Sequence, residues 1–448
     1  MVSLKLQDGM NLLSAGVLGA ALLLSPLAYA DDTLSQAVQA DYDAHLADLF
    51  DYFHRNPELS TMEIQTAKRL ASELRGAGFV VTEKVGGTGV VAIMENGPGP
   101  LVMMRADMDG LPVLEKSGLA NASKATQLDP AGNEVPVMHA CGHDVHITSL
   151  VGTAREMASS RDTWSGTLML IGQPAEERVM GARIMMDDKL WARFGQPDYA
   201  LAFHVSSGIP TGQMSAVIGS PYSGADTVDI EITGVGAHGA SPHRGIDPVV
   251  LGSQIVLALQ TVVSRNLAPR DAGVITVGSF HAGTKHNIIS DRAHLQLTVR
   301  NDNLETRELL LAGIKRVAEN MGRVAGLPED QLPKITVSDE SVPPTINDPQ
   351  LTQRLRSVWQ AQLGENIFYN KKRQGMGAED FPFFTTDPYI PSVYFAIGGT
   401  PQSAFDAEEA GGERVPSHHS PLFKIMPEPA VTLGVEATVG ALRELLKK

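Results

Sequence analysis

The sequence predicts an α/β domain into which a second, smaller α+β domain is inserted. Strand-like apolar runs alternate with helix-like segments in the first and last parts of the chain, a pattern typical of a sheet covered by helices. Between about residues 225 and 340 the pattern changes to β-α-β-β-α-β, which indicates a separate compact unit. The length of 448 residues agrees with this division, because a single hydrophobic core rarely extends over so long a chain.

The first thirty residues are predicted to be a cleaved secretory signal. Lys5 precedes an apolar run over residues 11–30, and this run ends in A-Y-A, a small-x-small triplet typical of a cleavage site. The alternative is a retained N-terminal anchor, because Asp8 lies close to the single lysine and weakens the charged region. We therefore expect an exported protein, periplasmic or secreted, whose mature chain begins near Asp31.

The first part of the mature chain alternates between helix and strand patterns. Residues 34–77 form two helix-like segments, in which apolar residues recur every three or four positions. Two β-rich runs follow, VVAIME and PLVMMRADM, and then a helix that begins near His143. The runs GTLMLIGQ and YALAFHV predict two more strands, separated by the helix-like GARIMMDDKLWARFG. The polar clusters RAD, QPAEE and FHV end or follow three of these strands, and functional groups in α/β sheets gather at the carboxyl ends of strands.

The inserted domain and the return to the first domain are also visible in the pattern. TVDIEITGVG, GVITVGSF and HLQLTVR predict strands, and DPVVLGSQIVLALQTVVSR and LETRELLLAGIKRVAENM predict helices. The proline-containing segment SDESVPPTINDP has no period and predicts the return linker. The predicted organisation is a signal peptide over 1–30, the first domain over 31–224 and 341–448, and the inserted domain over 225–340.

The net charge and the cysteine content limit the kinds of partner and of covalent link that the protein can have. The formal net charge of −15 argues against nucleic acid or an anionic membrane surface, since either calls for a basic patch. Beyond the N-terminal run, we expect no second hydrophobic stretch long enough to span a bilayer. Cys141 is the only cysteine, so no intrachain disulfide can form. A lone thiol in an exported protein is open to oxidation unless it is buried or bound, which favours a ligand role.

The segment HACGHDVH, residues 139–146, is the first candidate site. A pair formed by His139 and His143 on one helix face could bind zinc, but Gly142 between them indicates a turn that enters a helix. Cys141 and His143, on either side of this glycine, are better placed to converge on one ion. The alternatives are a structural histidine cluster, or a cysteine nucleophile with a base beside it.

Three further clusters supply candidate donors. Glu176 and Glu177 follow the apolar run LMLIG, so one carboxylate could bind a metal while the other acts as general base, although the pair could also lie on a solvated loop. His204 ends the next apolar run, where a structural histidine is the alternative. His418 and His419 lie in a Ser/Pro-bounded loop. Together these sulfur, imidazole and carboxylate donors suit Zn²⁺ or a similar transition ion.

The sequence resembles a known group of enzymes over roughly residues 45–440. The segments that carry the resemblance, in order, are RADMDGLP, VPVMHACGHDVH, QPAEE, FHV, GAHGASPHRGIDP, GAEDFPFF and HHSPLF. They are similar to those of the metal-dependent amidohydrolases of the aminoacylase, hippurate hydrolase and auxin-conjugate hydrolase group, within the wider family of carboxypeptidase G and succinyl-diaminopimelate desuccinylase. The resemblance implies a zinc-peptidase-like catalytic domain with an inserted lid or dimerisation domain, and a homodimer or higher homo-oligomer.

The resemblance also implies the site. Two divalent transition ions per subunit (Zn, Mn, Co or Ni) would be held by Cys141, His143, Glu177, His204 and His419. Glu176 would be the general base, and His238 would reach the partner's active site and stabilise the oxyanion. Asn287 and Arg300 resemble lid groups that hold a substrate carboxylate.

Two features of the sequence bear on which residues are the metal ligands. Arg105-Ala106-Asp107 stands where that family has His-x-Asp, so the resemblance implies that His143 takes over the metal and Asp107 orients a ligand. Of the two adjacent C-terminal histidines, we select His419 as the ligand because Ser-Pro-x-Phe follows it directly.

The implied function is hydrolysis of the amide bond in N-acyl or N-aroyl amino acids, which releases a carboxylic acid and an amino acid. The partners would be small N-acyl amino acids or short peptides, with no nucleic acid and, after signal cleavage, no membrane. The alternatives are an exported dipeptidase or carboxypeptidase of the same family, and an amidase that uses Cys141 as its nucleophile. A chelator distinguishes the last alternative from the metal-dependent ones.

Overall fold

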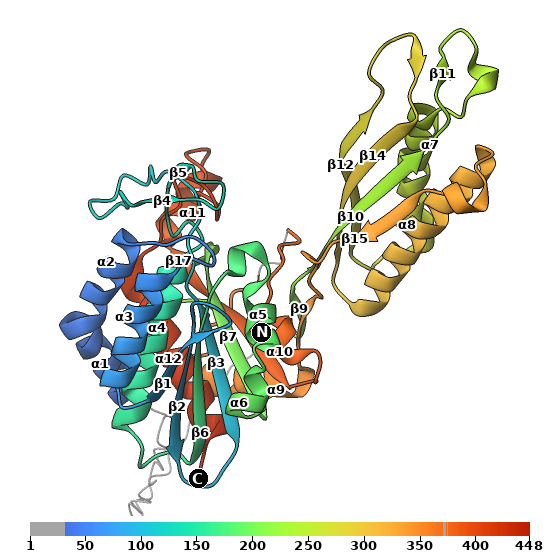
Figure 1. The fold of residues 1–448 in the computed structure, drawn as a ribbon. Helices are drawn as coiled ribbons and strands as arrows, with labels where there is room; N and C mark the ends of the chain where they lie inside the picture. Colours follow the sequence, from blue (N-terminus) through green and yellow to red (C-terminus); the bar gives the residue numbers. More distant parts are fainter. Residues whose placement is uncertain (1–31, 371–372, 374) are drawn as a thin grey trace, which may run out of the picture.

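The computed structural model describes residues 32–370, 373 and 375–448, and the predicted signal segment lies outside them. Figure 1 shows a larger α/β part and a smaller part of sheet and helices that projects away from it. The predicted α/β class is confirmed, and the strands of the smaller part run from residue 224 to residue 337. We call residues 224–337 the inserted unit. The predicted domain boundaries stay a prediction.

A mixed sheet forms the centre of the larger part, and seven strands of the described chain belong to it. The four inner strands β6, β3, β7 and β17 run parallel, and β1, β2 and β8 pair antiparallel at the two edges. Strands β3 and β6 are buried almost throughout, as expected for strands covered by helices on both faces. In spatial order the strands are β1 (Val80–Val85), β2 (Gly89–Asn96), β6 (Gly166–Gln173), β3 (Leu101–Asp107), β7 (Tyr199–Pro210), β17 (Ser392–Thr400) and β8 (Met214–Ser215).

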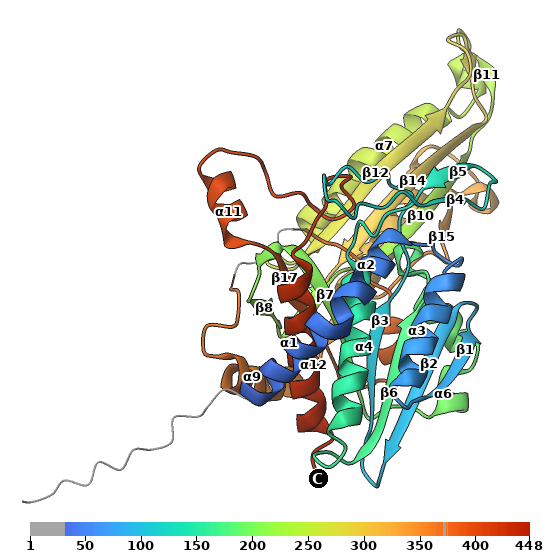
Figure 2. The same ribbon diagram turned by 90° about the vertical axis from the view of Figure 1, so that its left-hand side faces the viewer.

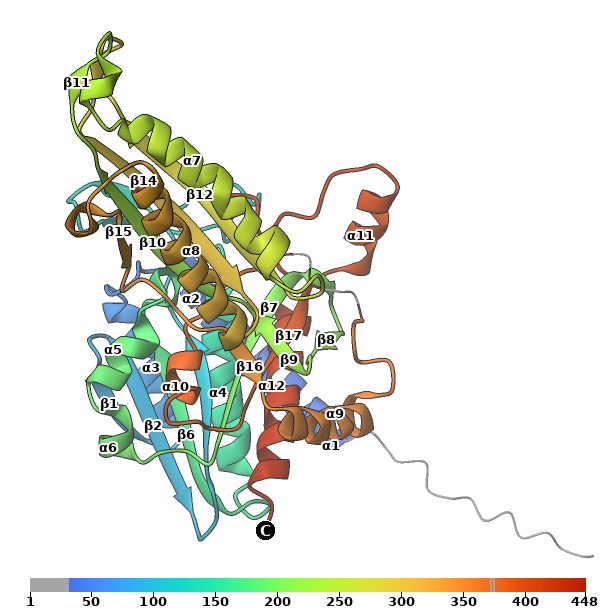
Figure 3. The same cartoon turned by 90° about the vertical axis from the view of Figure 1, so that its right-hand side faces the viewer.

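Helices cover both faces of this sheet. The first face, turned toward the viewer in Figure 2, carries α1 (Asp32–Asp41), α2 (Ala47–Arg55), α3 (Ile64–Gly76), α4 (His143–Ser159), α9 (Pro349–Leu363) and α12 (Pro427–Leu445). The opposite face, visible in Figure 3, carries α5 (Gly181–Asp187), α6 (Leu190–Phe194) and α10 (Pro382–Thr385). The sequence predicts one helical segment where α5 and α6 lie. The structure divides it because Lys189 has a φ of 59°, in the left-handed region.

The inserted unit is an antiparallel sheet with two helices on one face (Figure 3). Its strands, in spatial order, are β12 (Gly273–Ala282), β14 (Arg292–Asn301), β10 (Gly224–Thr233) and β15 (Lys334–Val337), and its helices are α7 (Pro248–Thr261) and α8 (Leu304–Val324). Along the chain this gives β10-α7-β12-β14-α8-β15, the predicted β-α-β-β-α-β order. The unit has its own core, in which Val228, Leu295 and Leu310 are fully buried.

Short elements connect and extend the two parts. Strands β9 (Gly219–Tyr222) and β16 (Thr345–Asn347) pair antiparallel where the chain leaves the larger part and returns to it, so the predicted linker contains a strand. At the far tip of the inserted unit, β11 (Ala237–His238) pairs with β13 (Ile288–Ile289). The remaining elements are the hairpin β4 (Thr126–Leu128) and β5 (Glu134–Pro136), and α11 (Gln402–Glu409).

One helical stretch corrects an expectation from the sequence. Within the described residues, Pro248–Asn266 is long and apolar enough to cross a membrane by length and composition alone, whereas we expected no second stretch of this kind. It consists of α7 and the π-helical turn Val262–Asn266 that continues it. Leu251, Ile255 and Leu259 are buried in the core of the inserted unit, so this stretch serves as a covering helix of that sheet.

Candidate metal centre

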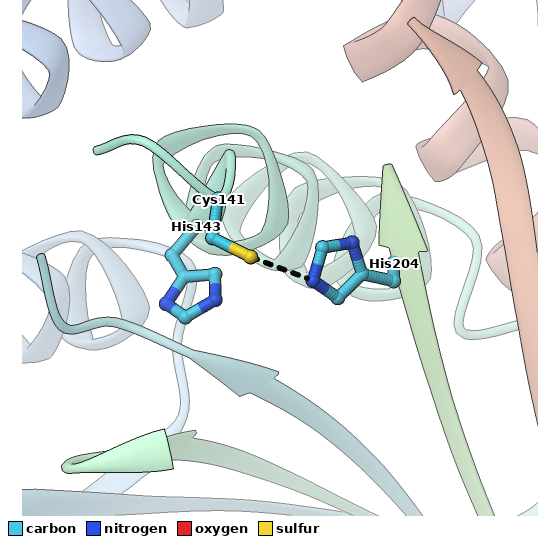
Figure 4. Close-up of side chains that lie close together, drawn as sticks. All are labelled: Cys141, His143 and His204. Atoms are coloured by element: carbon cyan, nitrogen blue, oxygen red, sulfur yellow. Dashed lines mark hydrogen bonds between the residues drawn. The ribbon is translucent and has the colours of Figure 1, made fainter. Parts of the chain in front are cut away.

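The five side chains predicted to bind metal come from four segments of the chain and lie together at one end of the main sheet. The candidate ligand atoms of Cys141, His143 and His204 all lie within 4.8 Å of one another (Figure 4). Those of Cys141, Glu177 and His419 do so as well. Because Cys141 belongs to both groups, the five side chains form one cluster, with the cysteine between its two halves.

The turn before α4 brings Cys141 and His143 to this cluster. Gly142 has a φ of 86°, and a Cβ atom there would lie 2.4 Å from Val205 Cγ1, so only glycine fits. The predicted turn that enters a helix is confirmed, since α4 begins at His143. His139 belongs to neither group of candidate ligands, and burial lowers its pKa to about 4.

Hydrogen bonds orient two imidazoles so that Nε2 faces the cluster. His143 Nδ1 lies 2.9 Å from the carbonyl oxygen of Asp109, to which it donates. His204 Nδ1 donates to the carbonyl oxygen of Val205 at 2.6 Å, and its Nε2 lies 3.4 Å from Cys141 Sγ. A carbonyl acceptor on Nδ1 fixes the tautomer and leaves Nε2 as the ligand atom, an arrangement common around protein-bound metals.

His146 and Asp107 form a supporting pair beneath the cluster. His146 Nε2 accepts the backbone N–H of Val205 at 2.8 Å, and its Nδ1 donates to Asp107 Oδ1 at 2.5 Å, so both ring nitrogens are engaged. The other carboxylate oxygen of Asp107 lies 3.7 Å from His143 Nε2. Burial would raise the pKa of Asp107, but Arg105, His143 and His146 hold it well below its usual range. Asp107 is thus an ionised carboxylate beside a candidate ligand, and its role in orienting that ligand stays a prediction.

Asp109 holds the glutamate pair in place. Its Oδ1 accepts the backbone N–H of Glu176 at 3.2 Å, and its Oδ2 accepts the N–H of Glu177 at 3.1 Å and the hydroxyl of Ser60 at 2.6 Å. Asp109 was not among the site residues predicted from the sequence. The available signal was its place two residues after Asp107 in the segment RADMDGLP.

Both glutamates lie in a buried, acidic environment. Glu176 Oε2 and Glu177 Oε1 each lie 3.9 Å from His143 Nε2. Burial raises the pKa of Glu176 well above its usual range, and Glu379 and Glu177 raise it further. Burial raises the pKa of Glu177 to about 7, although His143 opposes the shift. A raised pKa of this kind suits the Glu176 carboxyl group to accept a proton and return it.

Arg105 is fully buried beside the site, and its supporting role was also not predicted from the sequence. The guanidinium of Arg105 lies among the side chains of Asp107, Gln173, Glu379, Asp380 and Tyr394. Glu379 and Asp380 lie with Glu176 in a group of three carboxylates whose candidate ligand oxygen atoms are within 4.8 Å of one another. Arg105 therefore compensates the negative charge on this side of the base.

The two adjacent C-terminal histidines point to different places. His419, with a φ of 66°, extends its ring toward Glu177, and its Nε2 lies 3.3 Å from Glu177 Oε2. The His419 side chain is 57% exposed, so this edge of the cluster faces solvent. His418 turns the other way, and its Nδ1 lies 3.7 Å from Cys141 Sγ.

The three predicted groups from the inserted unit do not reach the cluster of their own chain. His238 and Asn287 are exposed neighbours at the far tip, where the Gly239 N–H donates to the Asn287 carbonyl at 2.9 Å (Figure 1). Arg300 lies near the base of the unit, opposite Ala225 on β10. Asn287, directly before β13 at the tip, is thus far from Arg300 at the base end of β14, and the roles of all three residues stay predictions.

The cluster fits a transition ion by two criteria. Its donors are thiol sulfur, imidazole nitrogen and carboxylate oxygen, the set that zinc and similar ions use. In addition, the buried His143 Nε2 and Glu177 Oε1 have no hydrogen-bond partner among the residues that the structure describes. An unpaired buried polar atom costs about 1–3 kcal/mol, and a bound cation would remove this cost at both atoms.

Comparisons with known proteins agree with this geometry. Residues 103–411 match the model of peptidase family M20/M25/M40. Hippurate hydrolase of Campylobacter jejuni is 35% identical over 74% of this chain and 82% of its own length. The IAA-amino acid hydrolase ILR1-like 2 of Arabidopsis thaliana is 35% identical over 83% of this chain and 79% of its own. Among solved structures, the Bacillus subtilis YXEP protein, a dinuclear metal-binding peptidase from the M20 family, superposes with a TM-score of 0.73. It is 26% identical to this chain, with 92% of this chain and 99% of that one covered.

Proposed function

Because the chain belongs to peptidase family M20/M25/M40, whose relatives named above are amide-bond hydrolases, we propose that it hydrolyses N-acyl or N-aroyl amino acids. The products would be a carboxylic acid and a free amino acid. The observation that carries the proposal is the buried carboxylate of Glu176 beside the five-donor cluster, with its Oε2 3.9 Å from His143 Nε2.

The proposed cofactor is a pair of divalent transition ions. The residues that would hold them are Cys141, His143, Glu177, His204 and His419. The sharing of Cys141 between two groups of candidate ligands, together with the dinuclear structural relative, supports two ions rather than one. When bound, such ions act as Lewis acids and lower the pKa of a water molecule from about 16 to about 7.

Glu176 is the proposed general base and acid. Its carboxylate would take a proton from the attacking water and then give it to the nitrogen of the departing amine, so the group returns to its starting state. Asp109 holds the backbone of Glu176, which fixes the direction of the carboxylate. Asp107 would keep His143 in place, and Arg105 would in turn hold the carboxylate of Asp107.

Substrate binding is proposed to involve a second subunit. The distance of His238 from the cluster of its own chain supports a homodimer or higher oligomer, in which His238 of the partner subunit would stabilise the oxyanion. Arg300 and Asn287 are the proposed groups for the substrate carboxylate. Only Nη1 of Arg300 makes hydrogen bonds within the described residues, to Thr298 and Val299, which leaves the rest of the guanidinium for a ligand.

We also propose that the protein is exported, on the basis of the N-terminal apolar run over residues 11–30. The expected product is a mature chain that begins near Asp31 and is found in the periplasm or the medium. Mass spectrometry of the N-terminal peptide tests this, and a retained N-terminus would contradict it.

The test of the proposed function is a substrate panel on the purified mature chain. The panel contains N-benzoyl, N-acetyl and indole-acetyl amino acids together with short dipeptides. We expect hydrolysis of N-acylated substrates, its loss with a chelator, and its recovery with Zn²⁺, Mn²⁺ or Co²⁺. Activity on dipeptides alone would favour the dipeptidase alternative. Full activity in the presence of the chelator would favour Cys141 as nucleophile.

A further inference from the structure

Three polar groups face the ring of His418: the backbone N–H of Ser207, the backbone of Cys141 and the sulfur of Cys141. The backbone N–H of Ser207 donates to His418 Nε2 at 3.2 Å. An imidazole nitrogen that accepts a hydrogen bond carries no hydrogen, so the ring hydrogen must lie on Nδ1. That Nδ1 is the atom 3.7 Å from Cys141 Sγ, and its N–H group is therefore available to the sulfur.

Packing restrains the ring in this orientation. Its centroid lies 4.9 Å from that of Phe423 and 5.2 Å from that of His204, with the His204 ring edge-on. The chain around it is tied to the Cys141 loop by the His419 N–H, which donates to the carbonyl oxygen of Ala140 at 2.9 Å. His418 is thus held against the sulfur by two rings and two backbone hydrogen bonds.

We propose that His418 is a positioning residue that donates an N–H···S hydrogen bond to the Cys141 thiolate. His418 Nδ1 belongs to none of the groups of candidate metal ligands among the described residues, whereas His419 does. The two adjacent histidines then have separate tasks: His419 would bind an ion, and His418 would hold the sulfur that the two halves of the cluster share. This inference rests on the proposed metal-dependent function.

The proposed hydrogen bond has a consequence that spectroscopy can detect. A hydrogen bond to a metal-bound thiolate draws electron density away from the sulfur, and such contacts tune the properties of cysteine-bound metals. Without the donor, the sulfur becomes richer in electrons. A transition that moves charge from sulfur to the metal then requires less energy.

The experiment uses the cobalt-loaded full-length mature protein and three variants. His418→Phe keeps a ring between Phe423 and His204 but removes the donor. His418→Asn offers an amide N–H close to the position of Nδ1 and serves as the conservative variant. His281→Phe, at an exposed site on β12, is the matched control. The measurements are the thiolate-to-cobalt charge-transfer band, the cobalt content and kcat/KM.

We expect the band to move to lower energy in His418→Phe and to stay near its wild-type position in His418→Asn and His281→Phe. Cobalt content should be unchanged, and kcat/KM of His418→Phe should fall by about 10–100-fold. An unmoved band in His418→Phe would overturn the inference, because the ring would then only fill space. Loss of one equivalent of cobalt would also overturn it, since His418 would itself be a ligand. If the wild-type protein itself shows no such band, both the proposed thiolate metal centre and this inference are refuted. The two outcomes above, by contrast, refute only the role of His418.

Discussion

The carboxylate of Asp109 accepts the backbone N–H of Glu176 at 3.2 Å, although 67 positions separate the two residues along the chain. The same carboxylate accepts the N–H of Glu177, and the carbonyl oxygen of Asp109 accepts from His143. One residue therefore fixes the proposed base and two proposed ligands at once. A small change at Asp109 should disturb all three.

Asp109→Asn tests this relationship. The substitution replaces one acceptor oxygen by an NH₂ group, which cannot accept the N–H of Glu176 or Glu177. We expect metal affinity or kcat/KM to fall by about 10–100-fold, measured by metal titration and steady-state kinetics. Asp129→Asn is the matched control, since Asp129 also accepts backbone N–H groups but lies in the exposed β4–β5 hairpin. Equal effects of the two substitutions would refute the special role of Asp109.

Glu176→Gln should remove turnover while metal content stays at the wild-type value. The amide cannot accept a proton from water, and loss of a general base typically costs about 10²–10⁴-fold in rate. Activity on the best substrate of the panel and elemental analysis of the purified protein are the measurements. Glu365→Gln, in an exposed turn, is the control. An active Glu176→Gln protein would exclude Glu176 as the base.

Gly142→Ala should destabilise the protein and weaken the site. The alanine at position 142, between Cys141 and His143, would have to adopt a positive φ. Its methyl group would also lie 2.4 Å from Val205 Cγ1. Gly212→Ala separates the cost of the positive φ from the cost of the steric clash. Gly212 has a φ of 78°, but no atom lies within 4 Å of the Cβ that an alanine would add. The control should lose about 1 kcal/mol of unfolding free energy, the cost of the left-handed backbone alone. Urea unfolding that gives the same loss for both variants would contradict the steric argument.

Removal of metal should lower thermal stability as well as activity. Ions that bind only the folded state stabilise it by about 2.7 kcal/mol at one hundred times the dissociation constant. We therefore expect Tm to fall after chelation, to recover with Zn²⁺, and to rise further with Zn²⁺ concentration. Calorimetry on chelated and reloaded protein measures this. A Tm that does not respond to either treatment would contradict a metal centre built from these residues.

A buried histidine away from the proposed ligands should make stability depend on pH. His54 Nδ1 lies 2.7 Å from Asp144 Oδ2, and its Nε2 lies 3.4 Å from Glu115 Oε1. Burial would lower the pKa of His54, but these two carboxylates raise it from 6.5 to about 10. A histidine whose pKa is raised in the folded state stabilises the protein fully below its unfolded pKa, and this contribution disappears as pH rises through the folded pKa.

The corresponding measurement compares urea unfolding of the wild type and His54→Gln at about pH 6 and about pH 10. The stability advantage of the wild type should be large at the lower pH and should shrink between the unfolded pKa of 6.5 and the folded value of about 10. An advantage that stays constant or grows with pH would show that the ion pair does not form.

The sequence could predict the donors of the site and the supporting Asp107, but not the supporting roles of Arg105 and Asp109. Cys141, His143 and the glutamate pair stand in short motifs at the ends of apolar runs, so local pattern was enough to find them. Arg105 and Asp109 act through contacts with segments far along the chain, and no local pattern encodes such a contact. Strand β1 was missed for a related reason: most of its residues are exposed or only partly buried at the sheet edge, so its apolar signal is weak.

The chain passes between the larger part and the inserted unit where β9 and β16 pair, so a rotation at this crossing would move the whole unit. Strand β12 runs from the base of this unit toward its tip and spans about 33 Å at about 3.3 Å per residue. Pivoting the arm by about 10° at the crossing would therefore sweep its tip, with His238, through about 6 Å. A modest rearrangement of a few residue pairs can thus be amplified into a displacement larger than the length of a hydrogen bond.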